Sequence, residues 1–195
     1  MNNVLVVGDE SLGGTYLLRM RVAQNIEVRF GRFQGGEPVL IPRGEMLYLG
    51  SAMRGLASRV LRHALRSGDK PAHGLYEPLL AEMKTVGLIN ACTEQCLSNR
   101  FRPPTQKKLH WHIDYLLDET AVMLTHAIFI RSHERLEGEL GAWLLAEEET
   151  AVLAPGLGAS DLKGHTHLLK VQANEIWWQK IVDGRFPPRY NAKTN

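Results

Sequence analysis

The stretch MLYLGSAMRGLASRVLRH, residues 46–63, joins a strand pattern directly to a helix pattern. Its first part is an apolar run that carries Tyr48 and then Gly50-Ser51-Ala52, which is typical of a strand that ends in a turn. From Gly55 to Leu65, apolar residues recur at helical spacing with basic residues between them, which predicts a basic amphipathic helix. Arg59 and His63 are four residues apart, so this helix presents both on one face.

The composition indicates one globular domain. The chain has 195 residues, of which 44% are apolar, and no window approaches eighteen uncharged apolar residues, so we expect no membrane span. The opening MNNVLVVGDESLGG lacks a basic start, so we expect no secretory signal. Together with a content of only two cysteines, Cys92 and Cys96, this favours the reducing cytoplasm. These two are interpreted as buried small side chains or free thiols rather than zinc ligands.

Charge is unevenly distributed although the net charge is only +2. Residues 54–70 hold five cations against one acid, and residues 100–108 hold four cations and no acid. Residues 131–149 hold six glutamates against two arginines. Clustered positive charge suits a phosphate backbone, while a solvated helix face is the equally weighted alternative.

The remaining elements follow from periodicity. We predict a strand at 14–22, a hairpin partner at 27–33, and further strands at 45–52, 109–117, 121–130 and 166–172. We predict helices at 55–65, 134–148 and 174–182, and one or two more within 76–101. A small mixed or antiparallel sheet flanked by helices follows, which is the α+β class. We interpret 1–195 as a single domain with a helical insertion at 71–106 and a C-terminal extension at 171–195.

Six sequence blocks occur in one order along the chain: GTYLL, YLGSA, RVLRH, LHWHIDYLL, LEGEL, and GLGASD followed by His167-Leu168. In this order they resemble the GIY-YIG nuclease superfamily, in the branch called Uri-type endonucleases, which also occurs fused to endonuclease III-like repair enzymes. The resemblance covers residues 14–66 and 108–170, and leaves the insertion outside it.

The resemblance implies a site for phosphodiester hydrolysis. It places the hydroxyls of Tyr16 and Tyr48 at the attacking water and the scissile phosphate, Arg59 as the phosphate clamp, and Glu137 as the ligand of Mg²⁺ or Mn²⁺. His63 would orient a tyrosine or assist proton transfer. Further residues of the site or its wall would be Gly50, where DNA approaches or the chain bends, and Ser51, Arg62, Ser160 and Asp161.

Each of these residues has an ordinary alternative. A tyrosine in a half-buried strand usually packs, and a histidine on a basic helix is often exposed. A tyrosine also titrates near ~10, so it acts as a base only if a metal or an arginine lowers its pKa.

The block HWHIDY carries its own pattern. If it is a strand, His110, His112 and Asp114 point to one face and apolar residues to the other. Such a polar row favours an active-site wall that supports the tyrosines or binds phosphate. Metal ligation and a plain solvent face are the alternatives.

One departure from the resembled branch concerns a cysteine site. Relatives carry cysteines beside the matched glutamate and after the SD pair, where this chain has Gly138, Leu162 and Gly164. Their absence argues against a structural zinc at this place, although His167 remains.

The sequence thus favours a metal-dependent DNA endonuclease acting in repair or recombination. A silent nucleic-acid-binding module of the same fold is the alternative, and RNA is a further candidate substrate. We expect Arg100, Arg102, Lys107 or Lys108, at the end of the insertion, to contact the nucleic acid.

Overall fold

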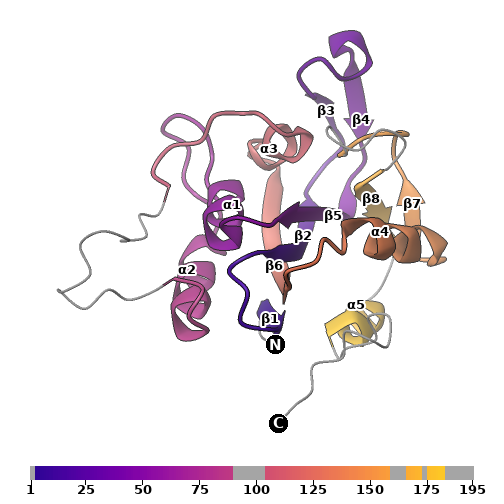
Figure 1. The fold of residues 1–195 in the computed structure, drawn as a ribbon. Coiled ribbons are helices and arrows are strands. Elements are labelled where there is room, and N and C mark those ends of the chain that lie inside the picture. The colour runs from indigo at the N-terminus through magenta and orange to yellow at the C-terminus, as the bar shows by residue number, and fades with distance from the viewer. Residues whose placement is uncertain (1–2, 90–103, 159–165, 173–174, 183–195) are drawn as a thin grey trace.

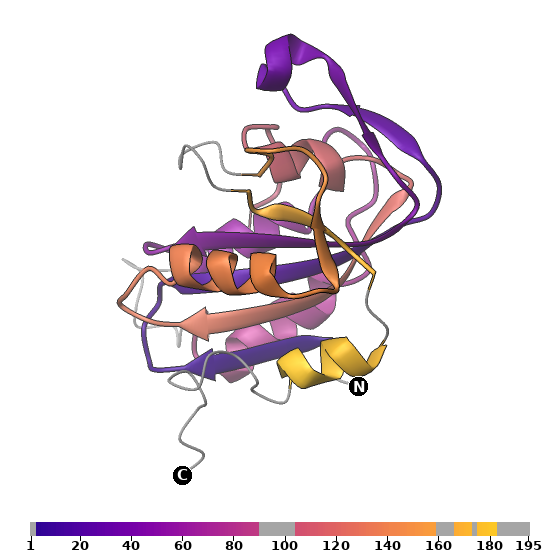
Figure 2. The same ribbon diagram turned by 90° about the vertical axis from the view of Figure 1, so that its right-hand side faces the viewer.

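The computed structural model describes residues 3–89, 104–158, 166–172 and 175–182 of the chain. A six-stranded mixed sheet forms the centre, with helices on both faces, and a two-stranded sheet projects from it (Figures 1 and 2). This arrangement confirms the predicted α+β class. None of the helices in the described segments has the length and apolar character needed to cross a bilayer.

The central sheet is antiparallel except at one end. Its strand order is β1-β6-β2-β5-β8-β7, and only β1 runs parallel to its neighbour, β6. The predicted strands at 14–22, 45–52, 121–130 and 166–172 are confirmed, whereas β1 and β7 were not predicted. The bounds are β1 Val4–Gly8, β2 Gly14–Val22, β5 Gly44–Ala52, β6 Val122–Arg131, β7 Thr150–Val152 and β8 Leu168–Val171.

The predicted hairpin between residues 14–22 and 27–33 is wrong. Strand β3 (Ile26–Arg29) instead pairs with β4 (Pro38–Ile41) in the separate two-stranded sheet. Both sides of β2 are already occupied, by β5 and β6, so β2 has no edge left for a third partner. The alternation in this segment therefore reflects the small projecting sheet, which Figure 2 shows standing away from the body.

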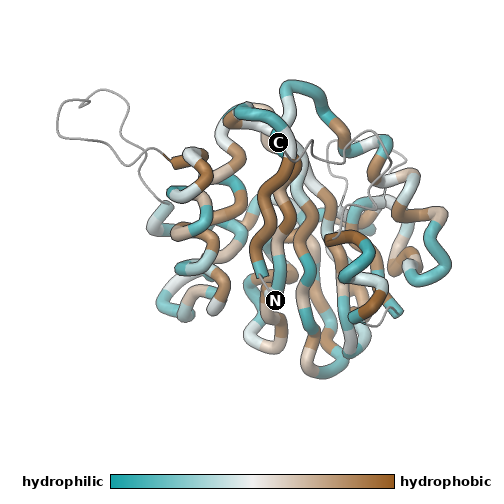
Figure 3. Tube along the Cα trace, turned by 90° about the horizontal axis from the view of Figure 1, so that it is seen from below, coloured by the Kyte–Doolittle hydropathy of each residue, from teal (hydrophilic) through white to brown (hydrophobic). Residues whose placement is uncertain are grey.

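The helices divide into two layers, each with its own core. Leu56, Leu79 and Ile113, from α1, α2 and α3, are buried against one face of the central sheet. Leu140 and Trp177, from α4 and α5, are buried against the other face. Figure 3 shows the apolar sheet between helices whose outer turns are hydrophilic. The bounds are α1 Leu56–His63, α2 Tyr76–Thr85, α3 His112–Leu117, α4 Glu137–Ala146 and α5 Glu175–Val182, and a short 3₁₀ turn at Phe33–Gly36 lies between β3 and β4.

The predicted strand at 109–117 is also wrong, because residues 112–117 form helix α3. Ile113 and Leu117, four residues apart, are both fully buried in the first core, which is helical rather than strand spacing. The carboxylate of Asp114 turns back to accept the backbone N–H groups of His110 and Trp111, which lie just before the helix. An acidic residue in the first turn that satisfies free N–H groups is a helix-start signal.

The insertion and the C-terminal extension are partly described. Helix α2 lies within 71–106 and buries Leu79 and Met83 in the first core. Helix α5 lies within 171–195 and buries Trp177 and Trp178 in the second core. Cys92, Cys96, Arg100 and Arg102 lie outside the described residues. Both segments therefore contribute to the two cores through their described helices.

Candidate active site

The two tyrosines lie on the same face of neighbouring strands. In the β2–β5 register, Tyr16 pairs with Gly50 and Leu18 pairs with Tyr48, so the tyrosines are diagonal neighbours, with ring centroids 6.1 Å apart. The Tyr48 side chain lies close enough to Tyr16 to oppose the rise of the Tyr16 pKa. Both residues are buried, with only 1% and 5% of their surface exposed. Strand pairing alone therefore brings together two residues that are far apart in the sequence.

Gly50 makes room for the Tyr16 ring. A Cβ atom at position 50 would lie 2.6 Å from the Tyr16 hydroxyl oxygen and from the ring carbon that bears it. Only a residue without a side chain lets the ring lie across β5. The structure thus gives Gly50 a packing role in the site, where the sequence suggested close approach of DNA or a bend.

A hydrogen-bonded chain leads from Tyr16 into the helical layer. The Tyr16 hydroxyl is 2.9 Å from Nε2 of His63, and Nδ1 of His63 is 3.0 Å from Oδ1 of Asp114. Because a carboxylate only accepts, Nδ1 of His63 carries the proton and donates it to Asp114. Nε2 of neutral His63 is then the acceptor for the Tyr16 O–H. All three side chains are buried.

Burial keeps the side chains of Tyr16, Tyr48 and His63 neutral. It raises the pKa of Tyr16, an effect that Arg59 opposes, and it raises the pKa of Tyr48 well above 10. It also lowers the pKa of His63 to about 4, although Asp114 opposes this shift. Neither tyrosine is thus a ready phenolate, and neutral His63 is the group that can take a proton.

Asp114 stays ionised because donors surround it. Burial alone would raise its pKa, but the His63 hydrogen bond and the charges of Arg62 and Lys107 lower it below the usual range. Nη2 of Arg62 donates to Oδ2 at 2.8 Å, and Oδ2 also accepts the two backbone N–H groups that precede α3. Asp114 therefore fixes the orientation of His63 and the start of α3 together.

Arg59 holds an unpaired guanidinium beside this chain. Its central carbon lies 3.8 Å from the centre of the Trp111 ring, and that of Arg62 lies 4.1 Å from the same centre. Arg62 is committed to Asp114 and to the Lys108 carbonyl. Among the residues that the structure describes, no acceptor hydrogen-bonds the guanidinium of Arg59. Its charge nevertheless lowers the pKa of both tyrosines, so it lies within electrostatic reach of them.

Glu137 lies in the opposite helical layer, at the start of α4. Its Oε1 is 2.9 Å from Nδ1 of His167, its Oε2 is 3.4 Å from Arg135, and Ser51 lies close enough to lower its pKa. Burial would raise its pKa, but His167 and Ser51 lower the pKa below the usual range. The carboxylate is therefore ionised, and its charge reaches through the sheet to raise the pKa of both tyrosines.

Other expected residues are not brought to the tyrosines. His110 is exposed and packs edge-on against Trp111, while His112 packs against Phe33 and accepts the Gly158 N–H. The prediction that His110 and His112 share one face with Asp114 is wrong, because residues 112–117 form a helix rather than a strand. Lys108 is exposed, whereas Lys107 is buried and donates to the carbonyls of His63 and Leu65, so in this conformation Lys107 faces the protein interior. Ser160 and Asp161 lie outside the described residues.

Trp111, Arg135 and His167 are contributors that the sequence reasoning did not assign. Asp114 is a helix-start signal three residues after Trp111, but nothing in the sequence places Trp111 beside Arg59. Nothing in the spacing of Arg135 and His167 ties either of them to Glu137.

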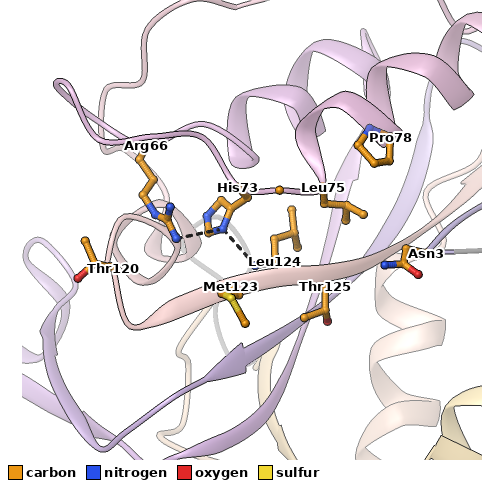
Figure 4. A pocket seen from close by; sticks show the side chains of 10 residues that line it. Asn3, Arg66, His73, Leu75, Pro78, Thr120, Met123, Leu124 and Thr125 are labelled. Atoms are coloured by element: carbon orange, nitrogen blue, oxygen red, sulfur yellow. Dashed lines mark hydrogen bonds between the residues drawn. The ribbon is translucent and has the colours of Figure 1, made fainter.

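A surface pocket of about 440 Å³ lies apart from the tyrosines (Figure 4). Arg66 and His73 line it, and both serve the backbone of β6. Arg66 donates to the Val122 carbonyl, and Nδ1 of His73 accepts the Leu124 N–H. These side chains occupy hydrogen-bonding groups of β6 that lie beyond the reach of β1. The pocket is thus explained by the capping of a strand edge.

The comparison with known proteins gives one match. The sequence model of a protein family described as "Domain of unknown function DUF123" matches residues 15–183. This span includes every candidate site residue named above. No curated protein and no solved structure matches the chain.

Proposed function

This chain belongs to the DUF123 family, and we propose that it is a metal-dependent endonuclease that hydrolyses DNA phosphodiester bonds in repair or recombination. We also propose that it is a Uri-type member of the GIY-YIG superfamily, on the basis of the six ordered sequence blocks. The observation that carries the proposal is the unpaired guanidinium of Arg59 beside the chain from Tyr16 through His63 to Asp114. An anion-binding fork beside a relayed base is what phosphodiester hydrolysis requires.

Arg59 supplies the contact to the scissile phosphate. A guanidinium donates two parallel hydrogen bonds to one anion, and this one has no acceptor within the described chain to displace. Because the charge of Arg59 acts on both tyrosines, a phosphate bound to Arg59 would lie near their hydroxyls. Both hydroxyls are buried in this conformation, so the side chains that cover them must move apart as the substrate enters.

Tyr16 and His63 remove the proton of the attacking water. As the water oxygen bonds to phosphorus, its proton moves to the Tyr16 oxygen and the Tyr16 proton moves to Nε2 of His63. The imidazolium that forms is stabilised by Asp114, which already accepts from Nδ1. The leaving oxygen takes a proton from solvent. In this scheme Tyr16 needs no lowered pKa, because it accepts one proton as it gives up another.

No cluster of three His, Cys, Asp or Glu side chains that could hold a metal is present in the described residues, so a magnesium or manganese ion would have Glu137 as its one charged protein ligand. The carboxylate is ionised, Ser51 offers a second oxygen, and one carboxylate completed by water and phosphate oxygens is a usual Mg²⁺ arrangement. The Arg135 side chain is half exposed and only 3.4 Å away, so it can give way to a cation. Such an ion would supply positive charge to the phosphodiester from the Glu137 side of the sheet, opposite Arg59.

A silent nucleic-acid-binding module is the second candidate. The burial of both tyrosine hydroxyls favours it, because a protein that only binds nucleic acid uses its surface groups and does not need these hydroxyls to be accessible. It would keep Arg59 and the basic face of α1 without cutting.

A nuclease assay separates the two. The full chain is incubated with Mg²⁺ or Mn²⁺ and a panel of single-stranded, duplex, flap and branched DNAs, with matched RNAs. The endonuclease proposal predicts metal-dependent cutting of at least one DNA, with chelator abolishing it. Binding to the panel without cutting in any metal rejects the enzyme and supports the module.

A further inference from the structure

We propose that Trp111 is a positioning residue that holds the guanidinium of Arg59 ready to receive a phosphate. The inference deepens the proposed function and rests on it for the identity of the substrate. It assigns Trp111 a role that neither the family match nor the sequence blocks give it.

Arg59 lies over the indole ring of Trp111, and its guanidinium donors have no hydrogen-bond acceptor in the described residues. The guanidinium carbon lies 3.8 Å from the ring centre, which is close contact for a cation over an indole face. A cation that stacks on a ring uses its face, whereas its N–H groups lie in its plane and point away at the edge. Stacking therefore restrains the long side chain of Arg59 without consuming the hydrogen bonds that a phosphate needs. An acidic partner would have consumed them.

The Trp111 ring is itself fixed. Its backbone N–H donates to Oδ2 of Asp114 at 3.0 Å, and its ring packs edge-on against His63, with centroids 6.0 Å apart. Arg62, which also lies on the ring, is held by the same Asp114 carboxylate. Asp114 thus anchors both the histidine that takes the proton and the ring that holds the clamp. A substitution that moves the Asp114 carboxylate should therefore disturb both His63 and Trp111.

Trp111 packs against the first core, and it also has contacts that ordinary core residues lack. Three residues of α3, Ile113, Leu116 and Leu117, fill the apolar core and are fully buried. Trp111 lies outside that helix, is half-buried, and contacts cations and imidazoles. Leucine at position 111 would keep bulk and lose the π face, whereas phenylalanine would keep a smaller π face.

The test compares Trp111→Phe and Trp111→Leu with the parent chain. Side-chain NMR of Arg59 is followed during a titration with inorganic pyrophosphate, and single-turnover cutting and DNA affinity are measured in parallel. We expect upfield ring-shifted Arg59 protons in the parent and the Phe variant, and unshifted ones in the Leu variant. Cutting should fall roughly 10- to 100-fold in Trp111→Leu, because the clamp is displaced, while DNA affinity changes less than about 3-fold. Trp111→Phe should recover most of the rate.

Trp143→Leu, on α4 in the opposite layer, is the matched control for loss of an indole ring. Arg59 protons without a ring shift in the parent, or pyrophosphate binding and cutting in Trp111→Leu equal to the parent, would overturn the positioning role. If the parent cuts and Trp111→Leu cuts as fast, the endonuclease stands and the inference fails. If the parent cuts no DNA, but its Arg59 protons are ring-shifted and its pyrophosphate binding is lost in Trp111→Leu, the inference stands and the endonuclease proposal fails.

Discussion

Replacing Asp114 by asparagine should reverse the hydrogen-bonded chain of the site while nearly preserving its shape. Oδ2 of Asp114 accepts from Arg62 and from two backbone N–H groups, so the single oxygen of asparagine will stay on that side. The NH₂ group then faces Nδ1 of His63, which must become an acceptor. Nε2 of His63 becomes the donor to the Tyr16 oxygen and no longer takes the Tyr16 proton.

The size of the effect follows from what is lost. Hydrogen bonds to a charged group contribute about 1.5–3 kcal/mol each, and the neutral amide retains part of this. We therefore expect Asp114→Asn to lower the free energy of unfolding by about 3 kcal/mol. Because a reversed histidine tautomer lowers turnover in a hydrolase triad about 10⁴-fold, we expect cutting to fall by roughly 10²–10⁴ with DNA affinity nearly unchanged.

Long-range ¹H–¹⁵N NMR of the imidazole reads the tautomer directly, and urea unfolding and single-turnover cutting give the two magnitudes. The matched control is Asp118→Asn. This acid is also buried, but it is bound to Ser67 and Lys70 and does not contact His63. Asp118→Asn should lower the free energy of unfolding and leave the His63 tautomer unchanged. An unchanged His63 tautomer in Asp114→Asn, or full cutting activity in the reversed state, would refute the assignment of His63 as proton acceptor.

Three further changes have defined outcomes. Gly50→Ala places a methyl group 2.6 Å from the Tyr16 ring, so it should lower the free energy of unfolding by about 1–3 kcal/mol in urea titrations and displace the ring. Burial holds the pKa of His63 and of His73 at about 4, below the unfolded 6.5, so the unfolded chain binds more protons as the pH falls. Stability should then drop by roughly 2 kcal/mol per histidine between pH 7 and pH 5. Glu137→Gln removes the charge that would hold the metal, so metal-dependent cutting should be lost while the fold is kept.

The controls lie elsewhere in the chain. A Cβ atom at position 138 would meet no neighbouring group within 4 Å, so Gly138→Ala should be neutral or slightly stabilising. His73→Gln, far from the tyrosines, should remove about half of the pH-dependent loss. Equal urea midpoints at pH 7 and pH 5 would contradict the histidine account. Undiminished cutting by Glu137→Gln would contradict the assignment of Glu137 as the metal ligand.

The sheet at the site could be predicted from local pattern, because alternation at 14–22 and 45–52 reflects buried strands. The helix after Gly55 was equally clear, since its apolar face is continuous. Local pattern failed at His112–Leu117, where six residues fit both a strand and a helix and the side chain of Asp114 decides for the helix. It also missed β1, whose five residues depend on parallel pairing with a distant strand.

The proximity of Tyr16 and Tyr48 was predicted from the family resemblance, and the register of β2 with β5 supplies its physical cause. The contact between His63 and Asp114 spans 51 residues and was not reached. No periodicity relates one helix to the start of another across an insertion. Lys107 shows the same limit. A lysine in a basic run is expected to be exposed, and only the structure shows that it donates to the Leu65 carbonyl just after α1.

The most direct test of the central claim is single-turnover cutting of DNA by the parent, Arg59→Ala and Arg54→Ala. Arg54 is an exposed cation just before α1 and controls for loss of one positive charge. The account predicts that the parent cuts, that Arg54→Ala cuts within a few-fold of it, and that Arg59→Ala cuts roughly 10²–10³ more slowly with similar DNA affinity. Equal rates for all three, or a parent that cuts no DNA in any metal, would contradict it.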